Sequence, residues 1–273
     1  MNPANPANLV NPANPVVSIL IPVKNEGLNL TIMLKILRAV VDVPHEVLVV
    51  FDREGDDSLT VVDAMAPEYP TIRAVHNTTG PGILNALRSG IAHAAGRYVL
   101  IFAADEVGPV LAIEDMLALM EQGCDFVSCT RYAHGGRRLG GSFIGGLLSR
   151  LANWTFCRLS GLRLTDATTG IKMFRPELFE TLHLEARPVG WAVAFEMGIK
   201  AQLAGLKLGE VPIVSIDRLY GGKSTFALGS WTSEYLRWFL WGLRQSLRSE
   251  RRGSGPVVVR IPSATALGGK VRM

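Results

Sequence analysis

The sequence predicts an α/β fold with a mostly parallel sheet flanked by helices. Continuous β-branched runs, which suit strands covered on both faces, alternate with segments whose apolar residues recur at helical spacing. Alternation at this pace favours right-handed crossovers between parallel strands. Polar residues also follow the last apolar residue of four of these strands. Because open α/β sheets bind ligands beyond the carboxyl ends of their strands, these tips predict one site. The alternative is that strand-to-helix loops are simply polar and solvated.

The predicted elements follow in order along the chain. Strands are expected at 16–23, 46–51, 71–76, 98–104 and 126–131, with helices from about Leu30, at 82–96 and near 111–122. After Arg131 the alternation stops, and glycines lead into a helix at 144–160. A helix around 191–204 precedes a strand at 208–218. The domain boundaries that follow are a tail at 1–15, one domain at 16–226, a basic amphipathic helix at 227–252 and a tail at 253–273.

Composition narrows the class of protein. The first residues repeat Asn-Pro-Ala, which disfavours helix, and we expect both tails to be disordered. Neither a secretion signal nor a spanning segment is recognised. Three cysteines without a CxxC pair argue against a disulfide framework or a structural zinc site and favour a reducing cytosol. The net charge of +4 and the absence of a recognisable motif favour a local anionic partner over nucleic acid.

Seven separated motifs carry a resemblance to a known family. They are SILIPVKNE, VVFDREGDD, GPGILNALRSGIAHAAG, FAAD, CTRY, DATTGIKMFR and DRLYGGKS, in this order. Residues from about 16 to 245 therefore resemble GT-A fold, family 2 glycosyltransferases of the dolichyl-phosphate mannose synthase-like branch. The resemblance implies a Rossmann-like GT-A domain that transfers a sugar from a nucleotide-diphosphate donor to a polyprenyl phosphate, with inversion at the sugar.

The resemblance also implies roles for the tips of the first two strands. Pro22 and Glu26 are expected to border the base, and Asp52 is expected to bind the nucleoside. The alternatives are a kink at a strand end for Pro22 and a favourable acid at a helix N-terminus for Glu26.

Asp105 matches the last acid of the family's Asp-x-Asp metal motif, whose first acid is replaced here by Ala103. The expected cofactor is Mg²⁺ or Mn²⁺, which can bind a pyrophosphate with one or two protein carboxylates. Affinity for the metal is then expected to be weaker than with two acids. Alternatively, Asp105 caps the following helix.

A late loop is expected to close on the donor. Arg218 and Lys223 would stabilise the departing diphosphate, and Ser224 would contact the donor, although Lys223 and Ser224 stand in the reverse of the family order. A bland exposed loop is the alternative. The family match makes Asp166 the carboxylate nearest the reacting centre, as a base or as an orienting group; a simple turn is the alternative. Arg131 and Lys172 are anion-contact candidates or surface charges.

The basic helix predicts contact with a membrane surface. One stripe consists of Leu236, Leu240, Leu243 and Leu247. An adjoining face consists of Arg237, Arg244, Arg248 and Arg251, with Trp238 and Trp241 at the edges of this arginine face. The alternative is that the helix packs on its own domain. We expect a cytoplasmic protein that is peripheral on the cytoplasmic face of the membrane. A membrane-protein partner or a homo-oligomer is left open.

Two rival functions stay open at this point. One is transfer to a soluble small molecule or glycan from the same class of donor. The other is a non-catalytic nucleotide-sugar-binding homologue, which the missing first acid and the exchanged Lys223 and Ser224 would suit. The sequence does not identify the base, the sugar or the oligomeric state.

Overall fold

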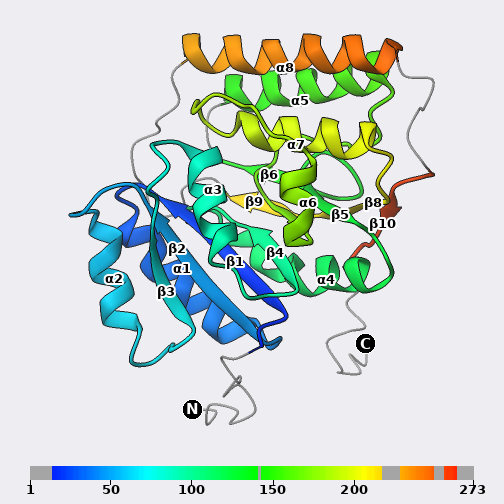
Figure 1. The fold of residues 1–273 in the computed structure, drawn as a ribbon. Helices are drawn as coiled ribbons and strands as arrows, with labels where there is room; N and C mark the ends of the chain where they lie inside the picture. Colours follow the sequence, from blue (N-terminus) through cyan, green and yellow to red (C-terminus); the bar gives the residue numbers. More distant parts are fainter. Residues whose placement is uncertain (1–13, 141–142, 217–227, 249–254, 263–273) are drawn as a thin grey trace.

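A computed structural model describes residues 14–140, 143–216, 228–248 and 255–262. Its centre is an eight-stranded sheet with helices on both faces (Figure 1), which confirms the predicted fold class. The predicted tail at 1–15 and the late loop at 217–227 fall almost entirely outside the described residues.

Most of the predicted elements are present with similar bounds, and the structure adds short strands and helices that the sequence did not predict. The large sheet contains β1 (Val17–Val23), β2 (His45–Phe51), β3 (Ile72–His76), β4 (Tyr98–Ile101), β5 (Phe126–Thr130), β7 (Lys172–Phe174), β8 (Leu208–Pro212) and β10 (Val258–Val259). A separate parallel pair joins β6 (Arg137–Leu139) and β9 (Val214–Ile216). The helices are α1 (Gly27–Val40), α2 (Asp57–Met65), α3 (Ile83–Ala92), α4 (Ile113–Glu121), α5 (Phe143–Ser160), α6 (Pro176–Thr181), α7 (Ala192–Leu203) and α8 (Leu228–Arg248). A short 3-10 helix, η2 (Gly108–Ala112), precedes α4.

The strand order of the large sheet is β10-β8-β5-β7-β4-β1-β2-β3. Every pairing is parallel except those of β7, which runs antiparallel to both β4 and β5. The runs of β1, β2 and β4 are buried along almost their whole length, as expected for strands covered on both faces. The sequence reading misses β7 because three residues are too few to show a period.

Helices cover both faces of this sheet and make two hydrophobic clusters. Residues of α1, α2 and α4 pack on one face, and residues of α3, α6 and α7 pack on the other. Figure 1 shows α5 and α8 stacked above α7, on the side away from the sheet. Both outer helices contribute to the second cluster, through Phe156 of α5 and Trp238 of α8.

Three predictions differ from the structure. The strand expected at 208–218 divides into β8 and β9, because the chain leaves the large sheet after Pro212 and joins β6. The tail expected at 253–273 contains β10, which pairs with β8, and Arg260, whose Nε lies 2.5 Å from Oδ1 of Asp115. That part of the tail prediction is wrong, because pairing with a distant strand leaves no local periodicity. Trp238 is also buried in the core and does not lie at the edge of an exposed arginine face.

Candidate active site at the carboxyl edge of the sheet

Parallel registers bring the predicted site residues to one edge of the sheet. The pairing of Val23 with Phe51 makes Lys24 and Asp52 the next opposed residues of β1 and β2. The pairing of Phe51 with His76 likewise puts Asp52 opposite Asn77, whose Nδ2 donates to Oδ1 of Asp52 at 2.7 Å. Neighbouring strands lie about 4.8 Å apart, so these three residues form a continuous polar row.

Asp105 lies on the other side of β1. The ladder between β1 and β4 ends at Leu20 and Ile101, and Asp105 lies in the turn that follows β4. The strand order reverses here, since β2 lies on one side of β1 and β4 on the other. Ligands of open α/β sheets bind at such a switch point. We call Asn77, Asp52, Lys24 and Asp105 the tip row.

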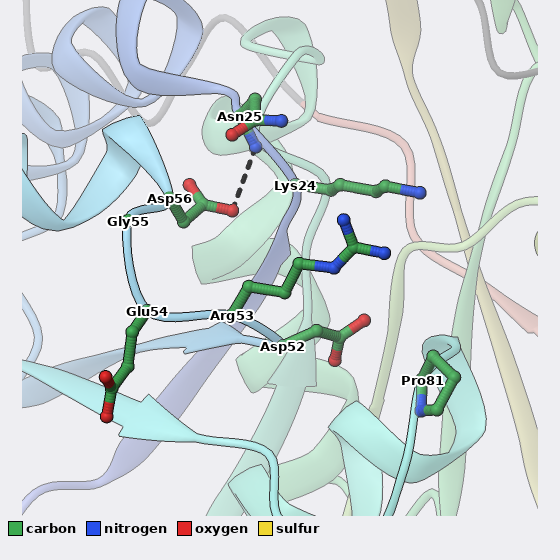
Figure 2. A pocket seen from close by; sticks show the side chains of 8 residues that line it. All are labelled: Lys24, Asn25, Asp52, Arg53, Glu54, Gly55, Asp56 and Pro81. Atoms are coloured by element: carbon green, nitrogen blue, oxygen red, sulfur yellow. Dashed lines mark hydrogen bonds between the residues drawn. The ribbon is translucent and has the colours of Figure 1, made fainter.

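A cavity of about 280 Å³ opens beside Asp52. Its lining consists of Lys24, Asn25, Asp52, Arg53, Glu54, Gly55, Asp56 and Pro81. Figure 2 shows the side chains of Lys24, Arg53 and Asp52 extending to the same side, whereas that of Glu54 points away. The cavity therefore presents two cations and one carboxylate to a ligand.

Acidic residues after β2 hold the turn between β1 and α1. Asn25 has a φ of 55°, a left-handed conformation that needs support. Its backbone N–H donates to Oδ2 of Asp56 at 2.9 Å, and the N–H of Gly27 donates to Oδ1 of Asp57 at 2.9 Å. Asp56 also caps α2 by accepting from the N–H of Ser58. These carboxylates support the cavity wall, and an acid pair before a helical run was the signal for this role.

Pro22 lies in β1 and Glu26 precedes α1, and both lie outside the cavity lining. Pro22 is half-buried in β1 opposite Val50. Oε2 of Glu26 accepts a hydrogen bond from Nδ2 of Asn29 at 2.7 Å. Their contact with a base stays a prediction.

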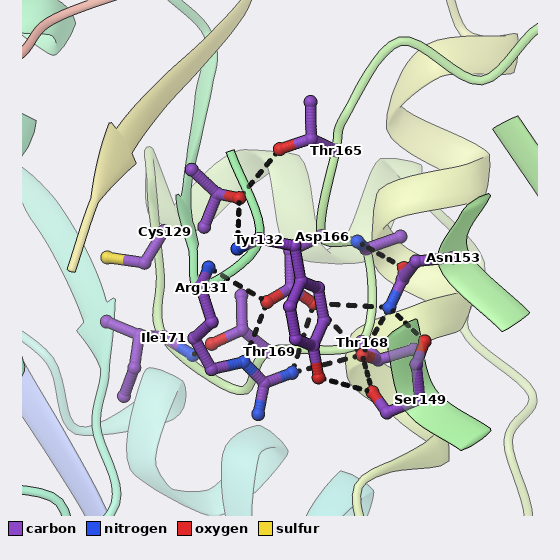
Figure 3. A network of polar contacts seen from close by, with 12 residues as sticks. Cys129, Arg131, Tyr132, Ser149, Asn153, Thr165, Asp166, Thr168, Thr169 and Ile171 are labelled. Atoms are coloured by element: carbon purple, nitrogen blue, oxygen red, sulfur yellow. Dashed lines mark hydrogen bonds and ion pairs between the residues drawn. The ribbon is translucent and has the colours of Figure 1, made fainter. Parts of the chain in front are cut away.

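Arg131 and Asp166 form a buried ion pair at the end of β5. Nε of Arg131 donates to Oδ2 of Asp166 at 2.7 Å, and Nη2 donates to Oδ1 at 3.0 Å. Asp166 is fully buried, and Thr168 and Asn153 also donate to it at 3.0 and 3.4 Å. Figure 3 shows this network closing around the carboxylate. With four groups already engaged on it, Asp166 is better suited to orienting Arg131 than to removing a proton.

Charge and burial compete at this pair. Burial alone would raise the pKa of Asp166, but the charge and hydrogen bonds of Arg131 outweigh it and hold that pKa below its ordinary value. Burial would lower the pKa of Arg131, and the charge of Asp166 raises it instead. Both groups are therefore ionised at neutral pH, and a fixed cation stands at the tip of β5.

A second buried group of polar residues lies beneath Asp166. Glu210 accepts from the N–H of Thr165 at 2.6 Å and from the N–H of Asp166 at 3.3 Å. Lys172 is fully buried in β7, where Nζ donates to Oγ of Ser128 at 3.0 Å. Burial lowers the pKa of Lys172 to about 8. The expectation that Lys172 is an anion contact or a surface charge is wrong, because β7 inserts between β4 and β5 and encloses it.

The residues at the tip of β4 can hold a metal ion only if substrate oxygens supply further ligands. Within the described ranges, no group of three or more His, Cys, Asp or Glu side chains is placed to hold a metal. Asp105 is half-buried, and with Ala103 two positions before it one carboxylate remains from the Asp-x-Asp pattern. The charge of the adjacent Glu106 helps to raise the pKa of Arg131. Magnesium in phosphate-binding sites commonly takes one or two carboxylates and completes its shell with phosphate and water, so Asp105 fits that mode.

The remaining predicted residues are Arg218, Lys223 and Ser224, and they lie outside the described residues. The structure therefore puts Asp52 and Asp105 after β2 and β4, the two strands that flank β1, and pairs Arg131 with Asp166. It adds Arg53, Asn77 and Glu210, for which the sequence alone assigned no role at the site, and it places Lys24, one of the polar residues expected at the strand tips, in the cavity lining.

Comparison with known proteins extends this description. The model of the family "Glycosyl transferase family 2" matches residues 18–183. The chain is 28% identical to undecaprenyl-phosphate mannosyltransferase from Micrococcus luteus over 84% of this chain and 96% of that protein. It is 26% identical to polyprenol monophosphomannose synthase from Mycolicibacterium smegmatis over 74% of this chain and 78% of that protein.

Solved structures show the same fold at lower identity. Glucosyl-3-phosphoglycerate synthase from Mycobacterium tuberculosis, in complex with Mn²⁺, UDP and glucosyl-3-phosphoglycerate, superposes with a TM-score of 0.65 at 18% identity, over 84% of this chain and 80% of that one. A mannosyltransferase from Pyrobaculum calidifontis in complex with GDP-Man and Mn²⁺ gives a TM-score of 0.59 at 18% identity, over 89% of this chain and 67% of that one.

Proposed function

The chain belongs to glycosyl transferase family 2, and we propose that it transfers a sugar from a nucleotide-diphosphate donor to a polyprenyl phosphate. The relatives from M. luteus and M. smegmatis support the acceptor class, since one name specifies undecaprenyl phosphate and the other specifies a polyprenol monophosphomannose. The observation that carries the proposal is the tip row beside the fixed cation of Arg131. It offers a nucleoside anchor, a metal ligand and an anion contact along one edge of the sheet.

The donor would lie along this edge. Its nucleoside occupies the cavity at Asp52, and its diphosphate extends toward Asp105. A divalent ion held by Asp105 and by phosphate oxygens would neutralise the charge that grows on the departing nucleoside diphosphate. Arg218 and Lys223 of the late loop are proposed to add cations, with Ser224 as a further donor contact, and Pro22 and Glu26 to border the base.

The acceptor chemistry explains why no strong base is required. The oxygens of a phosphate monoester are already ionised near neutral pH, so they attack the anomeric carbon without losing a proton first. Arg131 can hold this anion, and Asp166 keeps the guanidinium in place. A single displacement of this kind inverts the anomeric centre.

The decisive experiment is transfer of radiolabelled sugar to an organic-soluble product. Purified protein is incubated with labelled UDP- or GDP-sugars, with Mn²⁺ or Mg²⁺, and with or without a polyprenyl phosphate. Label in the organic phase only when the polyprenyl phosphate is present supports the proposal. Label transferred instead to a soluble acceptor would contradict it, and donor binding without any turnover would identify a non-catalytic homologue.

We further propose that α5 and α8 rest on a membrane surface. The outer face of α5 exposes Leu147, Leu148, Leu151 and Trp154, and that of α8 exposes Leu236, Leu240 and Leu247, each by at least half. The two helices are neighbours, with rings of Phe156 and Phe239 in contact at 5.1 Å between centroids. Exposed arginines flank these residues, namely Arg150, Arg158, Arg237, Arg244 and Arg248. Apolar side chains between cations suit the headgroup layer of an anionic bilayer.

This surface would bring the site to a lipid-linked acceptor. Among the described helices, none is both long enough and apolar enough to cross a bilayer. The three cysteines are free, which supports the cytoplasmic face of the membrane. Co-sedimentation with vesicles tests the surface: Leu151→Glu and Leu240→Glu should reduce binding to anionic vesicles. The control Leu111→Glu, on η2 and more exposed to solvent than either leucine, should not reduce it. Equal binding of all three variants would contradict the proposal.

A further inference from the structure

Lys24 and Arg53 are two cations that line the cavity at Asp52. Within the described ranges, neither side chain forms an ion pair or a hydrogen bond, although both line the same cavity. Other arginines of the described chain do have such partners, among them Arg73 with Glu46, Arg97 with Glu121 and Arg131 with Asp166. Two cations directed into one cavity indicate an anionic ligand.

The order of the strands indicates which part of a bound donor would contact Lys24. Lys24 follows β1, the strand between that of Asp52 and that of Asp105. A donor whose nucleoside is anchored at Asp52 and whose phosphates reach Asp105 must therefore cross the tip of β1. The part of the donor between its nucleoside and its sugar is the diphosphate. Lys24 and Arg53, which Figure 2 shows extending into this space, are placed to meet it.

The charge balance of the edge favours the same assignment. Ala103 stands where a second carboxylate would strengthen metal binding, and Asp105 alone is a weak holder of the ion. Besides Asp52 and Glu54, the cavity lining contains one further carboxylate, that of Asp56. It already accepts hydrogen bonds from the N–H groups of Asn25 and Ser58. Neutralisation of the diphosphate near the nucleoside therefore falls to the two side-chain cations.

We propose that Lys24 and Arg53 bind the donor diphosphate directly, so that nucleotide binding to this protein persists when divalent metal is removed. This inference rests on the proposed function, because it takes a nucleotide diphosphate as the ligand of the cavity. Lysine supplies a point charge to a phosphate oxygen, and arginine supplies two parallel donors. The metal then serves mainly the departing group at Asp105 and contributes less to holding the nucleotide.

Titration calorimetry with UDP and GDP, in EDTA and in Mn²⁺, tests the inference. The wild type should bind at least one of them in EDTA, with a dissociation constant within about tenfold of that in Mn²⁺. Lys24→Ala should weaken binding in EDTA by about tenfold or more, as expected for a lost hydrogen bond to a charged group, and Arg53→Ala should act in the same direction. Lys24→Arg should retain most of the affinity. Competition by uridine or guanosine, which lack phosphate, should be unchanged by Lys24→Ala.

A matched control removes the same charge elsewhere. Lys35 is an exposed lysine within α1, and Lys35→Ala should leave both dissociation constants unchanged. Binding in Mn²⁺ that disappears in EDTA would overturn this inference and leave the proposed function standing. Failure of all the common nucleoside diphosphates (UDP, GDP, ADP, CDP and dTDP) to bind under either condition would overturn both. Geranyl phosphate separates donor from acceptor phosphate: if Lys24→Ala weakens its binding and spares that of UDP and GDP, the cations serve the acceptor and the inference is wrong.

Discussion

Asp166→Asn tests the buried ion pair most directly. The substitution keeps the size of the side chain and removes its charge, so that the guanidinium of Arg131 loses its counter-ion. Asp166 is fully buried, and the side chain of Arg131 is only 10% exposed. Water therefore cannot replace the lost partner. Three donors of Arg131, its N–H, Nε and Nη2, would face an amide in place of a carboxylate.

The expected loss in the free energy of unfolding follows from this burial. Removing one partner of a buried ion pair usually costs 3–5 kcal/mol, because the remaining charge is left without compensation. Hydrogen bonds from Thr168 and Asn153 can still reach an asparagine oxygen, so we expect the lower end, about 3 kcal/mol. In an exposed pair the same change has little effect. Glu121→Gln, which breaks the pair with Arg97, should cost less than about 1 kcal/mol.

Urea unfolding followed by circular dichroism measures both free energies. A second experiment combines Asp166→Asn with Arg131→Met. Because Arg131→Met removes the unpaired charge, this double variant should recover part of the stability that Asp166→Asn loses. Sugar transfer should fall in every variant at these two positions. A loss below about 1 kcal/mol for Asp166→Asn, or a double variant less stable than the sum of the single changes, would refute the reasoning.

Three further predictions concern the supporting structure. Burial raises the pKa of Glu210 to about 7 in the folded protein, against 4.5 for an ordinary glutamate. Between pH 4.5 and 7 Glu210 therefore binds more protons in the folded state than in the unfolded chain, and its contribution to stability should fall as the pH rises. Glu210→Gln should flatten this fall in urea unfolding curves; a parallel dependence in both proteins would contradict it. Gly108→Ala should destabilise by about 1–3 kcal/mol, because the new Cβ would lie 1.9 Å from the carbonyl oxygen of Val214, and an unchanged melting temperature would show that η2 moves freely. Asn77→Ala removes the donor that holds Asp52 and should weaken UDP or GDP binding in Mn²⁺ by about five- to tenfold while sparing kcat. A fall in kcat with unchanged affinity would count against the nucleoside role of Asp52.

Much of the site could be predicted from the sequence because parallel strands share one carboxyl edge. Asp52 and Asp105 each end an apolar run, and that pattern alone placed them on the same side of the sheet. Asp166 was different. It lies 35 residues after Arg131, and nothing in the local pattern pairs the two. Their contact depends on the insertion of β7 between β4 and β5 in the sheet. No local sequence pattern predicts this insertion.

The sequence by itself determined the alternation of strands and helices and the polar strand tips, because apolar periodicity and turn residues act over a few neighbouring positions. Only the tertiary structure decided which tips adjoin, that Lys172 is enclosed, and that Trp238 turns inward while leucines of α8 face outward. These outcomes depend on packing between segments distant in the chain. A residue's environment in the folded protein is set by those partners, and a single sequence carries no local record of them.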